Sequence, residues 1–328
     1  KSPFDIRHVT PTVMLRADID ALPIQENPGK SYCSKNPGVM HACGHDCHMS
    51  IGLTVAKFIV DHKDELCGRI KIVFQPAEEG VRGANAVAES GVLDDVDYFV
   101  GSHIGMVAKY GEVVIDPWGF LCTTKFDVTY TGKPAHAGIE PNAGRNALAA
   151  ACSATLQLLG IPRHGSGMTR VNVGMLNAGK GRNVIPPNAT MVMEVRGETA
   201  EINDYMADQA MAIIKGNAIS YGVDYDVRKM GAACDMKNDP DMIDALREVA
   251  KGIPEIKTIT EKANFGGSED ASLLARRVKD HGGKVAFFVN GADREAGHHQ
   301  FNFDVNEEAL DTGFKMFAGM VKKICGRK

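Results

Sequence analysis

Two kinds of sequence periodicity follow one another along this chain, and their order limits the folds that it can adopt. In residues 1–119 and 232–328, short apolar segments alternate with segments whose apolar residues recur at helical spacing. TVMLRADID, RIKIVFQ and KVAFFVN are expected strands, whereas residues 46–60 and 307–324 are expected helices. Alternation of this kind predicts an α/β domain, with a mainly parallel central sheet flanked by helices.

The pattern changes in residues 120–231. TTKFDVTYTG alternates like a strand, and further strands are expected at 169–177, 189–197 and in YDVRKMG. Helices are expected at 144–159 and at 201–215, the second of them ending at Gly216. The order β-α-β-β-α-β is that of a ferredoxin-like domain. We therefore expect an α+β domain inserted at residues 120–231 into the α/β domain.

Composition excludes several classes of protein. The 37 basic and 41 acidic residues give a formal net charge of −4, which predicts no basic surface for nucleic acid. No apolar run approaches the ~18 residues of a membrane span, and KSPFDIRHVTPTVML lacks the apolar core of a signal peptide. The spacing of the eight cysteines suggests no disulfide framework, so we expect a cytoplasmic protein. The missing initiator Met is consistent with a fragment or a processed chain.

Potential metal ligands gather in four short segments beside expected strands. The segments are HACGHD (41–46), QPAEEG (75–80), GSHIG (101–105) and AGHHQFNFD (296–304). In an open α/β sheet, sites form at the carboxyl ends of the strands, so these side chains can meet at one edge. Taken singly, a paired Glu or a lone His is more often solvated surface or structural. Together the segments favour a metal site, in which one glutamate binds metal and its neighbour activates water.

Several motifs, in order, resemble the M20 metallopeptidase and amidohydrolase family, in its N-acyl-amino-acid hydrolase subgroup. They are LRADIDALP, MHACGHDCH, FQPAEEGVRGA, HIG, TGKPAHAGIEPNAGRNAL, GRNVIPPNATMVMEVRG, GSEDAS and AGHHQFNFDVNEEAL. The resemblance implies that the inserted domain serves as a lid or dimerisation domain. It also implies a segment before the first motif that this sequence does not contain, which bears on an edge of the sheet and part of the cleft wall.

The resemblance implies a role for each residue of the metal site. The expected ligands of two divalent ions, Mn²⁺ or Zn²⁺, are Cys43, His45, Glu79, His103 and His299. His299 is preferred to its neighbour His298, and Glu78 is the expected general base. Asp18 or Asp20 is expected to orient a ligand, with a strand cap as the alternative. His41, Cys47 and His48 are expected to be structural or to support the ligands.

The inserted domain is expected to bind substrate. The resemblance implies that His136 stabilises the oxyanion and that Asn183 and Arg196 hold the free carboxylate. Without the family, Arg196 would be a surface charge and Asn183 a turn residue. TTKFD, RVNVG and AGKGRNV are most similar to the branch that cleaves p-aminobenzoyl-glutamate, which is therefore the expected substrate. The alternatives are a general N-acyl-amino-acid deacylase and a weakly active metal-binding partner subunit. We expect a homodimer, or a heteromer with a related chain.

Overall fold

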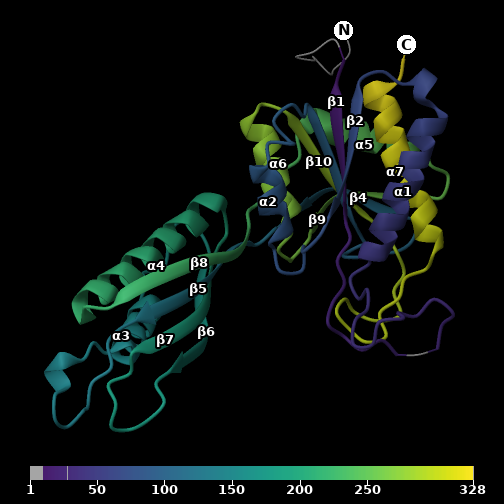
Figure 1. Cartoon of the computed structure of the whole chain (residues 1–328). Coiled ribbons are helices and arrows are strands. Elements are labelled where there is room, and N and C mark those ends of the chain that lie inside the picture. The colour runs from purple at the N-terminus through teal and green to yellow at the C-terminus, as the bar shows by residue number, and fades with distance from the viewer. Residues whose placement is uncertain (1–9, 28, 328) are drawn as a thin grey trace. The chain divides into compact units, whose positions relative to one another are not determined.

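The chain forms two compact units in a computed structural model, which describes residues 10–27 and 29–327 (Figure 1). Unit 1 comprises residues 1–120 and 236–328, and unit 2 comprises residues 121–235. The start of the N-terminal segment, for which no signal peptide is expected, lies outside the described residues. Each unit has its own sheet and its own core, so each is described by itself.

The sheet of unit 1 is mixed and mostly parallel. Its six strands have the order β2-β1-β3-β10-β4-β9, and their bounds are β1 Thr12–Asp18, β2 Arg69–Gln75, β3 Tyr98–Ile104, β4 Glu112–Trp118, β9 Thr258–Asn264 and β10 Lys284–Asn290. The four strands from β2 to β10 are parallel, whereas β4 pairs antiparallel with β10. The predicted mainly parallel sheet is confirmed, but β4 and β9 were not predicted.

Helices cover both faces of this sheet. On one face lie α1 (His45–Asp61), α5 (Pro240–Lys251) and α7 (Glu308–Cys325), and on the other α2 (Gly83–Glu89) and α6 (Ala271–Asp280) (Figure 1). Successive residues of a strand point to opposite faces, so Phe288 of β10 packs in the first core and Phe287 in the second. Such burial on both faces explains why the parallel strands read as continuous apolar runs. A 3₁₀ turn at Lys63–Glu65 precedes β2.

Unit 2 has the ferredoxin-like element order. Its antiparallel sheet has the order β6-β7-β5-β8, with β5 Cys122–Thr131, β6 Thr169–Ala178, β7 Asn188–Gly197 and β8 Asp224–Ala233. The helices are α3 (Ala147–Leu159) and α4 (Ala200–Tyr221), and a 3₁₀ turn spans Pro141–Ala143. Both helices pack on one face of the sheet, against alternate strand residues such as Phe126, Val128 and Met193.

The predicted end of α4 at Gly216 is wrong. The helix continues to Tyr221 and stops at Gly222, which adopts a left-handed conformation with φ 61°. The apolar stripe continues beyond Gly216, because Ala218 is buried in the core of unit 2. A glycine inside a helix costs only about 1 kcal/mol relative to alanine, so packing of the last turn outweighs it.

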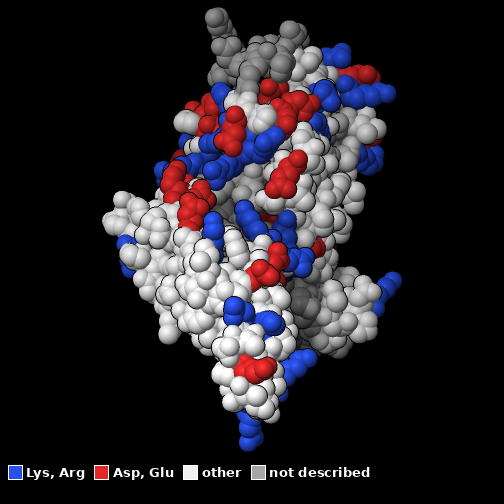
Figure 2. Space-filling model, turned by 60° about the vertical axis from the view of Figure 1, so that its left-hand side comes forward, with Lys and Arg blue, Asp and Glu red and all other residues white. Residues whose placement is uncertain are grey.

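Charged side chains of both signs are interspersed on the face drawn in Figure 2. Several exposed charges form ion pairs, such as Arg277 with Asp94 at 2.8 Å and Arg69 with Asp95 at 2.9 Å. Exposed pairs of this kind contribute little to stability. Within the described ranges, no helix is both long enough and apolar enough to cross a membrane.

Candidate metal centre

The carboxyl ends of three neighbouring parallel strands carry the residues of the site in unit 1. β1 ends at Asp18, β2 is followed by Glu78 and Glu79, and β3 contains His103. The loop before α1 adds Cys43 and His45 through a sharp turn at Gly44, which has φ 89°. A Cβ atom at Gly44 would lie 2.4 Å from the Ile104 side chain, so only glycine allows this close approach.

Cys43, His45 and His103 are buried together at the centre of the site. The Cys43 Sγ lies 3.6 Å from the His103 Nε2. His45 Nδ1–H donates to the Asp20 carbonyl oxygen at 3.0 Å, and the His45 Nε2 is buried with no hydrogen-bond partner. An imidazole whose Nδ1–H is fixed and whose Nε2 is free is the arrangement that metal-binding histidines have in proteins.

Glu79 and His299 complete the cluster. The His299 Nε2 lies 3.3 Å from one carboxylate oxygen of Glu79, and the other oxygen, Oε1, is buried without a partner. His299 has φ 65°, an unusual conformation for a residue with a side chain, and its N–H donates to the Ala42 carbonyl at 2.7 Å. Its position is thus fixed by a direct bond to the loop that carries Cys43.

The structure brings all the predicted ligands together. Cys43, His45 and His103 form one group whose donor atoms lie within 4.8 Å of one another, and Cys43, Glu79 and His299 form another. His298 is in neither group. The two unpartnered buried atoms, His45 Nε2 and Glu79 Oε1, would each cost free energy unless a ligand satisfied them. Thiolate, imidazole and carboxylate donors in this number fit divalent first-row metal ions.

Glu78 lies beside this cluster in an acidic and buried environment. Its carboxylate groups with those of Glu269 and Asp270, and its Oε2 lies 4.0 Å from the His45 Nε2. Burial and the Glu269 carboxylate raise the pKa of Glu78 well above that of an ordinary glutamate, against the opposing effect of Arg16. A carboxylate with a raised pKa beside a metal site is suited to accept and return a proton.

Sequence reasoning missed the buried Arg16. Its guanidinium forms ion pairs with Asp18 at 2.7 Å, Glu269 at 2.9 Å and Asp270 at 3.2 Å. Burial opposes ionisation of Asp18, yet the Arg16 charge holds the pKa of Asp18 well below its usual range. Asp20, by contrast, bonds the Glu79 N–H at 3.0 Å, so both predicted orienting acids contact the ligand segments. The adjacent acids in GSEDAS, which precede α6, were the available signal for Glu269 and Asp270.

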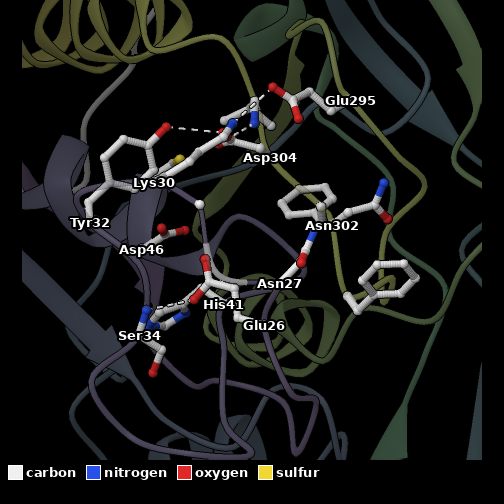
Figure 3. Close-up of a pocket in the computed structure, with 15 residues that line it drawn as sticks. Glu26, Asn27, Lys30, Tyr32, Ser34, His41, Asp46, Glu295, Asn302 and Asp304 are labelled. Carbon is white, nitrogen blue, oxygen red and sulfur yellow. Dashed lines mark hydrogen bonds and ion pairs between the residues drawn. The ribbon is translucent and has the colours of Figure 1, made fainter.

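A cavity of about 300 Å³ lies next to the donor cluster and shares a loop with it. Figure 3 shows Lys30, Tyr32, Asp304 and Glu295 on one side of this cavity and His41 on another. Lys30 pairs with Asp304 and with Glu295, the latter at 2.9 Å, and the Tyr32 hydroxyl donates to Asp304 at 3.0 Å. The cavity borders the 41–46 loop, but its described lining contains none of the predicted ligands.

In unit 2, His136 and Asn183 lie close together. The Ala137 N–H donates to the Asn183 carbonyl at 3.0 Å, and His136 forms a β-bridge with Val184. The His136 Nδ1 accepts bonds from the N–H groups of Gly138 and Ile139, each at 3.1 Å. Backbone amides only donate, so the proton of a neutral His136 must be on Nε2. That nitrogen is therefore available as a hydrogen-bond donor.

Arg196 lies near the opposite end of the unit 2 sheet. It is eight residues beyond Asn188, the first residue of β7, which corresponds to about 26 Å of extended strand. Asn183 lies beyond Asn188 in the other direction, since strand-like bonding continues past it through Ile185 and Ala135 at 2.9 Å. The Arg196 guanidinium makes a two-pronged contact with Glu194, at 2.9 and 3.2 Å. One copy of unit 2 therefore does not bring Asn183 and Arg196 together.

Comparison with known proteins places the chain among metal-dependent hydrolases. The sequence pattern of "Peptidase family M20/M25/M40" matches residues 14–323. A Haemophilus influenzae protein, named as the homolog of one chain of p-aminobenzoyl-glutamate hydrolase, is 51% identical, over 98% of this chain and 78% of that protein.

Solved structures show the same relationship. The structure of an aminobenzoyl-glutamate utilization protein from Klebsiella pneumoniae has a TM-score of 0.80 and 38% identity, over 96% of this chain and 71% of that one. The Bacillus subtilis YXEP protein, described as a dinuclear metal binding peptidase from the M20 family, has a TM-score of 0.69 and 28% identity. That match covers 96% of this chain and 82% of the YXEP chain.

Proposed function

Because this chain belongs to peptidase family M20/M25/M40 and is a hydrolase of that family, we propose that it cleaves the amide bond of an N-acyl amino acid, with p-aminobenzoyl-glutamate as substrate. The observation that carries the proposal is the buried Glu78 beside a cluster of metal donors in which His45 Nε2 and Glu79 Oε1 lack partners. The names of the similar proteins from H. influenzae and K. pneumoniae support this choice of substrate.

The residues of unit 1 divide the chemistry between them. Cys43, His45, Glu79, His103 and His299 would hold two divalent ions, Mn²⁺ or Zn²⁺, which when bound polarise the amide carbonyl and lower the pKa of a water molecule. Glu78 takes a proton from the attacking water and returns it to the nitrogen of the leaving amino acid. Its raised pKa favours the second transfer, because the protonated carboxyl is then stable near neutral pH.

The residues of unit 2 would bind the two ends of the substrate, as a lid and dimerisation domain. His136 donates from Nε2 to the oxyanion with Asn183 beside it, and Arg196 holds the free carboxylate with its planar fork. Since Arg196 lies at the far end of β7, a homodimer in which each copy supplies one of these groups fits the proposal. The name of the H. influenzae relative describes one chain of a hydrolase with more than one, which supports a related second chain as the other assembly. We further propose a cytoplasmic location, consistent with eight free cysteines.

A substrate panel tests the proposed function. The metal-loaded protein should hydrolyse p-aminobenzoyl-glutamate with a higher kcat/KM than hippuryl-glutamate or N-acetyl-glutamate. Equal rates on all three would indicate a general N-acyl-amino-acid deacylase. No hydrolysis of any of them by a protein with full metal content would contradict the proposal and indicate a binding subunit.

Replacing Arg196 by alanine should mainly raise KM, because a charge-assisted pair to the substrate carboxylate is lost. The expected loss is on the order of 2–3 kcal/mol, seen as a higher KM with little change in kcat. The Arg196→Ala variant should also lose the preference for free acids over the corresponding amides. Glu194→Gln is the matched control, because it removes the partner of Arg196 but keeps the guanidinium, and its KM should not rise. A variant that keeps the wild-type preference would show that another residue binds the carboxylate.

Replacing His136 by alanine should instead lower kcat, by about a hundredfold or more, since an oxyanion donor is removed. Steady-state kinetics with p-aminobenzoyl-glutamate would separate this effect from a change in KM. His164→Ala is a suitable control, since the His164 Nδ1 likewise accepts a backbone N–H, from Ser166 at 3.2 Å, and no role is proposed for it. A kcat within a few-fold of wild type would rule out His136 as the oxyanion donor.

A further inference from the structure

His48 is a buried histidine of α1 that touches the metal cluster without belonging to it. Its ring lies 4.8 Å from that of His103, between centroids, and only 4% of the residue is exposed. Both of its ring nitrogens are already bonded. The Nε2 accepts the Ile104 N–H at 2.8 Å, and the Nδ1 is in a short contact with the Asp18 carboxylate.

These two bonds fix the proton of His48. A backbone N–H can only donate, so the His48 Nε2 carries no hydrogen in this contact. The proton is therefore on Nδ1, where it is donated to Asp18. Because the lone pair of Nε2 is used by Ile104, His48 has no free donor atom for a metal ion. Its position among the ligands must have another explanation.

Ile104 connects His48 to a predicted ligand. While its N–H binds His48, its carbonyl oxygen accepts the Nδ1–H of His103 at 2.9 Å. That bond places the proton of His103 on Nδ1 and leaves Nε2 free, directed at the Cys43 Sγ at 3.6 Å. The orientation of the His103 ring thus depends on the backbone position of Ile104, which is the last residue of β3.

The other end of this chain of bonds is anchored by charge. Asp18 accepts from the Arg16 guanidinium at 2.7 Å, and both side chains are fully buried. Asp18 also faces the His45 Nε2 at 3.5 Å, so the two bonds that His48 and Arg16 make also hold this acid in place. Every member of the series from Arg16 through Asp18, His48 and Ile104 to His103 is buried, so water does not compete for these bonds.

We propose that His48 is a positioning residue: by binding the Ile104 N–H and Asp18, it fixes the end of β3 and so holds His103 in the tautomer and direction that offer Nε2 to a metal ion. The inference rests on the proposed metal-dependent function. A second-sphere contact of this kind typically contributes 10–100-fold to metal affinity.

Two near-isosteric variants separate the two bonds of His48. His48→Gln can place its side-chain carbonyl oxygen near the position of Nε2 and so still accept the Ile104 N–H. His48→Asn can still donate to Asp18 but does not reach Ile104. Val55→Ala is the matched control, because Val55 is a buried residue of the same helix that packs in the core and touches no ligand.

The first measurement uses the metal-free protein. Nitrogen-15 NMR of the histidine rings should show His103 protonated on Nδ1 in wild type and in His48→Gln, and a mixture of tautomers in His48→Asn. An Nε2–H tautomer of His103 in the wild-type protein would overturn the proposal, whether or not the variants fold. This result does not depend on catalysis or on a bound metal.

The second measurement is the affinity for Zn²⁺, together with the visible absorption of the Co²⁺-substituted protein. His48→Asn should bind Zn²⁺ about 10–100-fold more weakly than wild type and show an altered Co²⁺ spectrum, whereas His48→Gln should resemble wild type. Val55→Ala should lower the melting temperature with no change in Zn²⁺ affinity. Equal losses of affinity in both His48 variants and in Val55→Ala would show that only folding stability is affected, and would overturn the proposal. If wild type binds neither metal, the proposed function fails, while the NMR result still decides the role of His48.

Discussion

Glu78→Gln is expected to lower kcat by a factor on the order of 10²–10⁴ while leaving the metal content unchanged. Glutamine has nearly the same size and can still accept hydrogen bonds, but it does not take a proton from water at neutral pH. Because Glu78 is buried beside Glu269 and Asp270, no solvent-exposed carboxylate is positioned to replace it. Steady-state kinetics together with elemental analysis of the same preparation would measure both quantities.

Glu79→Gln is the comparison that gives this result its meaning. Glu79 contacts His299 at 3.3 Å and is the predicted ligand, so its replacement should weaken metal binding itself. Activity should then recover at least in part when metal is added in excess, whereas Glu78→Gln should not respond. Two variants with normal metal content and similar kcat values would contradict the proposed division of roles between the adjacent glutamates.

Cys43→Ser is expected to lose metal and activity together. A hydroxyl is a far poorer ligand than a thiolate, and Cys43 is shared by both groups of donors in the cluster. Dialysed protein analysed for metal content would show the loss directly. Full occupancy in Cys43→Ser would exclude Cys43 as a ligand.

Proton release gives this variant a second readout. In the metal-free protein, burial and the Glu79 carboxylate raise the pKa of the Cys43 thiol, so it is protonated at neutral pH. Burial alone would lower the pKa of His45, but Asp18 and Asp20 raise it to about 9, so His45 also holds a proton at pH 7. Metal binding must displace both protons, so affinity should rise with pH between about 6 and 9. Calorimetry in buffers of different ionisation enthalpy should show fewer protons released by Cys43→Ser.

The sequence predicted the parts of the fold that have strong local periodicity. The parallel strands are buried on both faces and were recognised as apolar runs, and the strand-end segments placed Cys43, Glu79 and His103 at one edge. β4 and β9 were missed because their patterns are weak: β4 includes Pro117, and the outer strand β9 is largely polar and partly exposed. Pairing with neighbouring strands, rather than local preference, decides their conformation.

The predicted site was incomplete for a different reason. Arg16 joins Asp270, which is 254 residues away in the sequence, and no local pattern announces a contact of that range. The proton positions of His136 and His103 depend on single backbone bonds, to Gly138 and Ile104 respectively, which also have no sequence signature. The identities of the ligands could therefore be read from motifs, whereas the contacts that orient them could not.

Strand β7 has a genetic consequence. It separates the His136–Asn183 pair from Arg196 by the length of an extended strand, so one copy of unit 2 does not place both at one substrate. If each centre of a homodimer draws these groups from different copies, a lesion at one end of β7 and a lesion at the other disable different copies' contributions. A mixed population of the two damaged chains would then contain some intact centres. The two ends of a single strand would behave as separate complementation groups within one gene.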